Sequence, residues 1–179
     1  MSNPLVIVAH PDLSQSRINA AWIAALQQAP AIAVHDLYGR FPDEAIDVQA
    51  EQQLLLAHDR IVLQFPFHWY NCPPLLKKWL DVVLEHGWAY GPGANALQGK
   101  QMSIAVSTWS KPEDYRKDGR YKRTMEELTS PFEVTALRVG MRYLPGFFLN
   151  GVGDIDDTQL AANAHAYRAH VQQGGRASR

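Results

Sequence analysis

The sequence predicts an α/β protein with a doubly wound, five-stranded parallel sheet that carries helices on both faces. Short apolar runs without polar alternation, such as residues 5–9, are typical of strands buried on both sides of a parallel sheet. Helical patterns separate these runs, and this alternation indicates βαβ units joined by right-handed crossovers. The length of 179 residues suits one domain with one core.

The first helix follows the strand at 5–9 after a polar loop. Ile18, Trp22 and Leu26 fall at i, i+4 and i+8, and therefore on one helical face, and Pro30 ends the pattern. The same order then repeats with a strand at 32–37, a helix at 48–57 and a strand at 61–65.

Pro73 and Pro74 mark the start of the next helix, because proline is well tolerated in a first helical turn. The remaining elements are a Gly- and Pro-rich loop at 91–99, a strand at 102–107, a polar segment at 109–123, a helix at 125–139, a strand at 143–150 and a helix at 157–171. We expect residues 1–173 to form a single domain and residues 174–179 to be a disordered tail.

Composition and charge argue against several classes of protein. Hydrophobic residues make up 46% and charged residues 20% of the chain, as in ordinary soluble proteins. The formal net charge of −1, without a long basic run, argues against nucleic acid as a partner. No apolar stretch reaches the roughly 20 residues of a membrane helix and no signal peptide is evident, so we expect a cytoplasmic protein. Cys72 is the only cysteine, and we expect it to be a small buried hydrophobe.

The loop after the first strand, residues 10–19, is rich in hydrogen-bond donors and runs into a helix. Ser16 is placed to cap that helix, whose free first-turn N–H groups and dipole favour an anion. The side chains that would complete a phosphate cradle are those of His10, Ser14, Arg17 and Asn19. An ordinary capped loop with an incidental histidine explains the same spacing, and the spacing alone does not choose between the two.

The loop after the third strand, residues 65–74, gathers aromatic side chains at the edge of the sheet where ligands bind. Planar side chains at this place would stack beside a flat heterocycle. The alternative is that Trp69 and Tyr70 pack on helices or on a partner subunit.

Two familiar motifs fit this sequence poorly. Residues 91–96 match the dinucleotide pattern G-x-G-x-x-A, but they follow a helix instead of a strand and open no helix, so we reject that motif. Residues 9–12 are similar to the Ala-His-Pro-Asp-Asp start of zinc-dependent N-deacetylases, but Leu13 stands in place of the catalytic base. A third zinc ligand is also missing, since no H-x-x-H pair follows, so a zinc hydrolase is a distant alternative.

Several segments, in a fixed order along nearly the whole chain, carry a family resemblance. They are Ala9-His10-Pro11, Ser16-x-x-Asn19, His35-Asp36-Leu37-Tyr38, Pro42-Asp43, Ile46-Asp47, Glu51-Gln52, Gln64-x-Pro66, Trp69-Tyr70, Pro73-Pro74-Leu75-Leu76-Lys77, Trp79-Leu80-Asp81 and Gly87-Trp88-Ala89-Tyr90-Gly91. In these segments the chain resembles the NAD(P)H:quinone oxidoreductase family, and most closely its bacterial branch with the potassium-efflux ancillary proteins KefF and KefG. The resemblance implies a flavodoxin-like fold that binds a flavin.

The resemblance also implies which residues hold the flavin. They are His10, Ser16, Arg17, Ile18 and Asn19 for the phosphate and ribityl chain, Phe67, His68, Trp69 and Tyr70 along the isoalloxazine, and Ser107, Thr108, Trp109 and Ser110 in the loop after the fourth strand. Tyr115 lies where related enzymes place a tyrosine that contacts flavin or substrate, and is the candidate catalytic residue. An exposed loop aromatic is the alternative for Tyr115. No metal is implied.

The sequence departs from the family pattern at Trp109 and Ser110, where relatives commonly carry two glycines. Glycine lets the backbone approach the flavin edge closely. The Trp109 indole would block the ring, redirect the loop, or stack over the flavin and narrow the access of substrate.

The function that the resemblance implies is that of an FMN-dependent NAD(P)H:quinone oxidoreductase, which transfers hydride in a two-electron ping-pong sequence. FMN is expected rather than FAD, because no long C-terminal extension is present to cover an adenosine half. The alternative is a regulatory ancillary subunit of a potassium/proton antiporter with weak or no flavin turnover. The partners implied are a quinone or similar small acceptor, a second copy in a homodimer with Trp88–Tyr90 at the partner's pocket, and a membrane antiporter that would place the protein at the inner face of the cell membrane.

Overall fold

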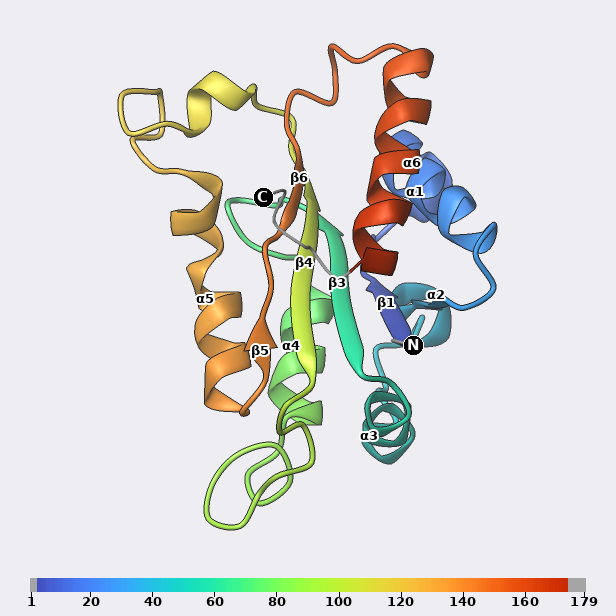
Figure 1. Cartoon of the computed structure of the whole chain (residues 1–179), viewed down its shortest axis with the longest axis vertical. Coiled ribbons are helices and arrows are strands. Elements are labelled where there is room, and N and C mark those ends of the chain that lie inside the picture. Colours follow the sequence, from blue (N-terminus) through green and yellow to red (C-terminus); the bar gives the residue numbers. More distant parts are fainter. Residues whose placement is uncertain (1–2, 174–179) are drawn as a thin grey trace.

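The structure of the protein, a computed structural model, describes residues 3–173 and is built around a twisted parallel sheet (Figure 1). The strand order is β2-β1-β3-β4-β5, and β6 also pairs with β4. The predicted doubly wound α/β fold is therefore confirmed. The tail expected at 174–179 lies outside the described residues.

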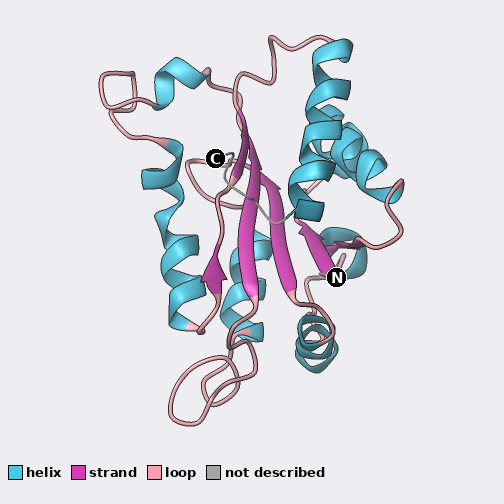
Figure 2. Cartoon of the chain, in the orientation of Figure 1, coloured by secondary structure: helices cyan, strands magenta, loops and turns pink. Residues whose placement is uncertain are grey.

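Strands and helices alternate as the apolar runs predict, with helices on both faces of the sheet (Figure 2). The strands are β1 (Pro4–Val8), β2 (Ala33–Asp36), β3 (Arg60–Pro66), β4 (Gln101–Ser107), β5 (Arg142–Tyr143) and β6 (Phe147–Leu149), all paired in parallel. The helices are α1 (Arg17–Gln27), α2 (Leu37–Arg40), α3 (Val48–Leu56), α4 (Pro74–Val83), α5 (Met125–Arg138) and α6 (Asp157–Gln173). Short 3-10 turns lie at Leu13–Gln15 and Pro112–Tyr115.

Two expected strands differ from those observed. The strand expected at 143–150 is split into β5 and β6, because Pro145 has no N–H to donate to a neighbouring strand. The strand expected at 32–37 ends at Asp36, whose carboxylate accepts the Gly39 N–H at 3.2 Å and so caps α2. Leu37 therefore begins a helix instead of ending a strand.

Each face of the sheet has its own apolar core, because successive side chains of a strand point to opposite faces. Val6 of β1 packs with α1 and α6, where the rings of Trp22 and Tyr167 lie 4.8 Å apart. Ile7 faces the other way, toward α3, α4 and α5, where the rings of Phe65 and Phe132 lie 5.1 Å apart. Helices α1 and α6 thus cover one face, and α3, α4 and α5 cover the other.

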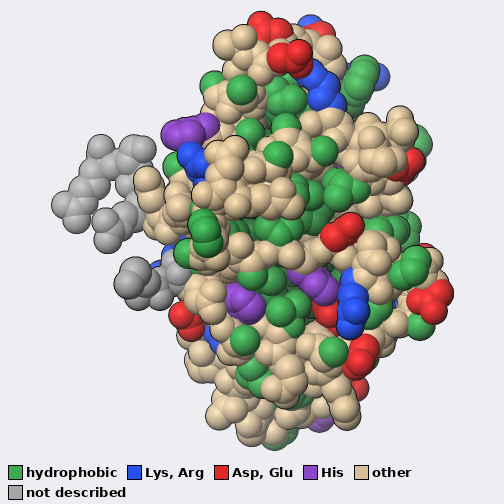
Figure 3. Space-filling model, turned by 90° about the vertical axis from the view of Figure 1, so that its right-hand side faces the viewer, with side chains coloured by type: hydrophobic (Ala, Val, Ile, Leu, Met, Phe, Trp, Pro, Cys, Tyr) green, Lys and Arg blue, Asp and Glu red, His purple; other side chains and the backbone are tan. Residues whose placement is uncertain are grey.

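Charged side chains of the described residues form no single-sign patch on the face of the molecule that Figure 3 shows. Acidic and basic side chains are scattered among apolar ones on the side that α1 and α6 cover (Figure 3). None of the helices within residues 3–173 is long and apolar enough to cross a membrane. Cys72 is buried as expected, and burial raises the pKa of its thiol to about 11, so it is not a reactive thiolate.

Candidate functional site

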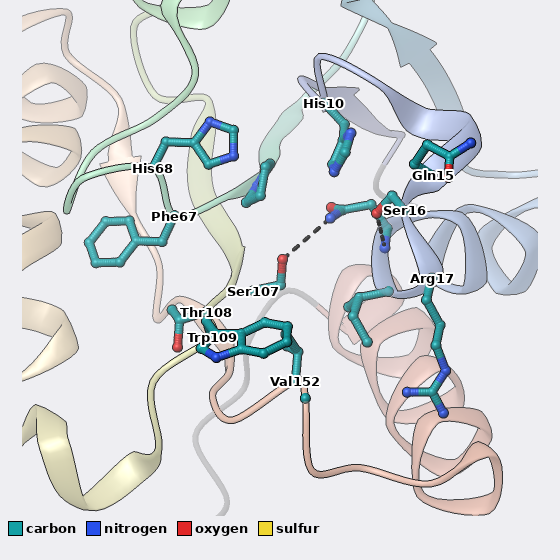
Figure 4. Close-up of a pocket in the computed structure, with 14 residues that line it drawn as sticks. His10, Gln15, Ser16, Arg17, Phe67, His68, Ser107, Thr108, Trp109 and Val152 are labelled. Carbon is teal, nitrogen blue, oxygen red and sulfur yellow. Dashed lines mark hydrogen bonds between the residues drawn. The ribbon is translucent and has the colours of Figure 1, made fainter.

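A cleft of about 520 Å³ opens at the carboxyl end of the sheet, where the strand order reverses between β1 and β3 (Figure 4). Its wall comes from the loops that follow β1, β3, β4 and β6. The lining residues are His10, Gln15, Ser16, Arg17, Ile18, Asn19, Pro66, Phe67, His68, Ser107, Thr108, Trp109, Val152 and Gly153. The volume is typical of a site for a small molecule.

One end of the cleft is built to receive an anion. The Ser16 hydroxyl accepts the Asn19 N–H at 3.1 Å, which confirms the predicted helix cap. Within residues 3–173, the N–H groups of Arg17 and Ile18 donate to no other protein group. These two donors and the dipole of α1 favour a negative charge at this end.

His10 contributes a neutral donor to the same end. Its Nδ1 accepts the Asp12 N–H at 3.1 Å, so the proton of the neutral imidazole sits on Nε2. Burial, and then the nearby His68, lower the pKa of His10 and keep the ring neutral. The ring points into the cleft (Figure 4), where Nε2–H can donate to an oxygen of a ligand.

Two side chains expected in this cradle point elsewhere. The Arg17 guanidinium donates to the Ile155 carbonyl at 2.9 Å and to the Asp157 carboxylate at 2.6 Å, beside the start of α6. The Ser14 hydroxyl donates to Asp12 at 2.6 Å. Arg17 therefore offers its backbone N–H to the cleft, while its charge holds α6 against α1.

The floor of the cleft is a buried polar network. Asn19 Nδ2 donates to Ser107 Oγ at 3.3 Å, and Gln64 Nε2 donates to Asn19 Oδ1 at 3.1 Å. These three side chains are buried, and they join the ends of β3 and β4 to α1. Among the described residues, Gln64 Oε1 has no hydrogen-bond partner. Sequence analysis gave Gln64 no role at the site, although a glutamine inside an apolar strand was the available signal.

The aromatic loop after β3 contains a strained turn. His68 and Asn71 exchange two backbone hydrogen bonds of 2.9 and 3.0 Å across Trp69 and Tyr70, whose φ angles are +49° and +62°. Two left-handed central residues define a type I′ turn, which normally carries Asn-Gly. Each such residue costs of order 1 kcal/mol, and strain of this kind concentrates at functional sites. Trp69 is 93% exposed, so its indole does not pack on a helix of this chain.

A second cavity of about 140 Å³ adjoins the cleft and is lined mainly by aromatic rings. Its residues are Phe67, Trp69, Tyr70, Trp109, Ser110, Tyr115 and Tyr121, and it shares Phe67 and Trp109 with the cleft. Tyr115 is 7% exposed, so it is a buried wall residue rather than an exposed loop aromatic. We call this second space the aromatic cavity.

Trp109 stands between the two spaces without closing the cleft. Its side chain is 79% exposed and is turned toward the loop after β6. A Cβ on Gly153 would lie 3.1 Å from the indole atoms Cζ2 and Cη2, so glycine at that position gives the ring room to lie against the backbone. The cleft of about 520 Å³ remains open beside it.

All the residues that the resemblance assigns to the flavin, and Tyr115, line one of these two spaces, whereas Ser14 of the expected phosphate cradle lines neither. Sequence analysis missed Gln15, Pro66, Val152, Gly153 and Tyr121 as lining residues. The Gly-Val-Gly run at 151–153, directly after the last strand, was the available signal for part of this set. Residues 88–90 lie in the connection from α4 to β4, at the opposite end of the sheet (Figure 1).

The strand order 2-1-3-4-5, with a cleft at the switch point, defines a protein of the flavodoxin class. The pairing of an anion-binding end with an aromatic end is the layout of a site for a flat heterocycle that carries a phosphate. Residues 2–171 match the family described as having a flavodoxin-like fold, and the chain belongs to this family.

Two curated relatives cover most of the chain. The chain is 47% identical to the uncharacterized NAD(P)H oxidoreductase YdeQ of Bacillus subtilis, over 93% of this chain and 85% of the relative. It is 40% identical to the glutathione-regulated potassium-efflux system ancillary protein KefG of Pectobacterium carotovorum, over 93% of both chains.

Two solved structures are similar over nearly their whole length. General stress protein 14 of Treponema denticola, in complex with FMN, has a TM-score of 0.92 and 41% identity and covers 96% of this chain and 98% of its own. An NADPH-quinone reductase from P. pentosaceus has a TM-score of 0.87 and 34% identity and covers 94% of this chain and 97% of its own.

Proposed function

We propose that this protein is an FMN-dependent NAD(P)H:quinone oxidoreductase, with residues 1–173 as its single flavin-binding domain. One observation carries the proposal: an anion-binding helix start lines the open cleft, and an aromatic cavity adjoins the same cleft. The similarity to an FMN-bound structure and to proteins named NAD(P)H oxidoreductase and NADPH-quinone reductase supports it.

The residues of the cleft fit FMN. The N–H groups of Arg17 and Ile18, together with His10 Nε2–H, suit a phosphate. Hydroxyl and amide groups on the floor, from Asn19 and Ser107, suit a polyol chain. The residues that would border the ring are Phe67, His68, Trp69, Tyr70, Thr108, Trp109 and Ser110.

When bound, the flavin supplies the redox chemistry, accepting hydride from NAD(P)H and delivering two electrons to a quinone. The residues of the protein bind the flavin and its substrates and orient them. Because His10 is neutral, the start of helix α1 would balance the negative charge of the phosphate. The aromatic rings would fix the plane in which a flat ligand lies. Tyr115 is buried in the wall of the aromatic cavity and would contact the substrate there.

A visible spectrum tests this proposal. The purified protein should bind added FMN, the absorbance should bleach with NADPH or NADH without oxygen, and a soluble quinone should restore it. Ser16→Ala removes the hydroxyl that caps α1 and should weaken FMN binding, while Asn95→Ala, exposed and remote, serves as the control. A colourless protein that takes up no FMN contradicts the proposal.

The likeness to KefG favours a second candidate function, regulation of a potassium/proton antiporter. In that role the protein would be cytoplasmic and would sit at the inner face of the membrane through its partner. Potassium efflux from cells that carry the antiporter, with and without this protein, tests it. If the efflux is unchanged and the protein reduces quinones rapidly, the regulatory role is wrong and the enzymatic role stands.

We also propose a homodimer. The exposed apolar side chains of Trp69, Val134 and Leu137 offer contact area for a second copy, and residues 88–90 would reach the partner's cleft. Light scattering from the purified protein measures the mass directly, and a mass near 20.1 kDa rules the dimer out.

A further inference from the structure

A pair of hydroxyl groups lies in the wall of the aromatic cavity. Ser110 Oγ and Tyr121 OH lie 2.7 Å apart in a half-buried hydrogen bond. Ser110 is also one of the two positions where the sequence departs from the family pattern. The bond joins the end of the loop after β4 to a residue 11 positions further along the chain.

Tyr121 links this loop to the strained turn on the other side of the cavity. Its ring centroid lies 5.1 Å from that of Tyr70 and 5.2 Å from that of Tyr115. The nearby Tyr121 also raises the pKa of the Tyr70 hydroxyl. The loops that follow β3 and β4 therefore contact each other at Tyr121.

Two polar contacts of residues 111–123 add little to the position of this wall. Tyr121 N–H donates to the Asp114 carbonyl at 3.1 Å, a bond inside the segment. Lys111 pairs with Asp154 at 2.8 Å, but both side chains are mostly exposed, and such pairs add little stability. The Tyr121 ring packs against the apolar core, and the half-buried bond to Ser110 fixes the position of its hydroxyl.

We propose that the Ser110–Tyr121 hydroxyl pair positions Tyr121 as the specificity-determining wall of the aromatic cavity, so that one-ring quinones are accepted in preference to fused-ring quinones. The cavity of about 140 Å³ is much smaller than the adjoining cleft of about 520 Å³, so its wall limits the size of the ring system that enters it. This inference rests on the proposed function. Tyr121 acts as a positioning residue and takes no part in electron transfer.

Cleavage by trypsin tests the Ser110–Tyr121 hydrogen bond, which we call the tether, without any flavin. Residues 111–123 contain six lysines and arginines, so cleavage in this segment reports its opening. Ser110→Ala and Tyr121→Phe should each speed cleavage by about 3- to 10-fold, and the double variant no further, because both remove one shared bond. Ser130→Ala and Tyr143→Phe are the matched controls, since neither hydroxyl borders the cavity.

Kinetics of the FMN-loaded full chain test the preference. The same two variants should raise kcat/KM for a fused-ring quinone relative to a one-ring quinone by about 3- to 10-fold. An unchanged quinone preference, or additive effects in the double variant, overturns the inference. If the chain binds no FMN, the proposed function is wrong and the quinone preference falls with it, whereas the cleavage result still decides the tether.

Discussion

Trp79 Nε1 donates a hydrogen bond of 2.7 Å to Glu51 Oε2, which joins α4 to α3 beneath the sheet. Glu51 is only 2% exposed, and His35 Nε2 lies 3.0 Å from the same oxygen. A carboxylate buried this deeply is retained because it satisfies the Trp79 ring nitrogen, which would otherwise lack an acceptor.

Replacing Glu51 should therefore destabilise the fold. Glu51→Ala leaves the Trp79 N–H unsatisfied and should lower the free energy of unfolding by about 2–3 kcal/mol. Glu51→Gln keeps an acceptor oxygen and should lose less. Urea unfolding followed by tryptophan fluorescence measures both, with the exposed Glu44→Ala as control. Equal losses for the alanine variants of Glu51 and Glu44 contradict this account.

The polar floor makes Asn19 important for stability and for ligand binding. Asn19→Ala leaves Ser107 Oγ without its donor and Gln64 Nε2 with only its longer bond, of 3.4 Å, to the carbonyl of residue 19, and should cost about 1–3 kcal/mol of unfolding free energy. FMN affinity, measured by fluorescence quenching, should fall in the same variant. The exposed Asn95→Ala should change neither quantity.

A substitution that removes the strain in the turn at Trp69 and Tyr70 should stabilise the fold and weaken the binding of FMN. Trp69→Asn places a residue that tolerates left-handed backbone where an exposed indole now stands, so stability should rise by about 0.5–1 kcal/mol. FMN affinity should fall, because an aromatic border is lost. Trp109→Asn, at a position without positive φ, should give no such gain. A loss of stability in Trp69→Asn speaks against stored strain.

The position of the Arg17 guanidinium separates two models of the phosphate end. Since it binds Ile155 and Asp157, Arg17→Ala should change FMN affinity by less than about 3-fold, and the loss of an exposed ion pair should cost under about 1 kcal/mol. A fall of about 10-fold or more, the effect of losing a charge-assisted bond, would mean that the guanidinium turns to the phosphate.

Stability should fall in mild acid. Burial lowers the pKa of His170, and Arg60 adds to the effect, so the unfolded chain takes up the proton before the folded one. The stabilising contribution of the neutral His170 is complete above the ordinary histidine pKa of about 6.5. It is lost as the pH falls below that pKa toward the lowered pKa of the folded state. His10 acts in the same direction. Urea midpoints should drop from about pH 7.5 to about pH 5.5, and less so in His170→Gln. The exposed His165→Gln should keep the full drop.

The sequence was sufficient for the order of the elements, because unbroken apolar runs and helical periodicity report burial directly. Sequence patterns also predicted the cap at Ser16, since the preference of serine for that place is local. Resemblance placed the residues after β3 and β4 at one site. The split between β5 and β6 was missed, although Pro145 marks it, because the apolar residues around it continue the pattern of a strand.

The direction of a side chain was harder to predict. Arg17 was assigned to the anion because it neighbours the cap, but its partner Asp157 is 140 residues away in sequence and meets it only in the fold. Tyr121 was missed for a similar reason. Its place in the wall depends on Tyr70, which reaches it from another loop.

The break in the strand at Pro145 also affects how a second copy would associate in the proposed homodimer. The sheet ends in the four-residue β2 on one side and in β5 and β6, of two and three residues, on the other. Long unpaired strand edges recruit strands from other chains, and edges this short give little to pair with. In the proposed homodimer a second copy would therefore dock through helices and loops, and the sheet and the cleft at its carboxyl end would stay as a single chain forms them.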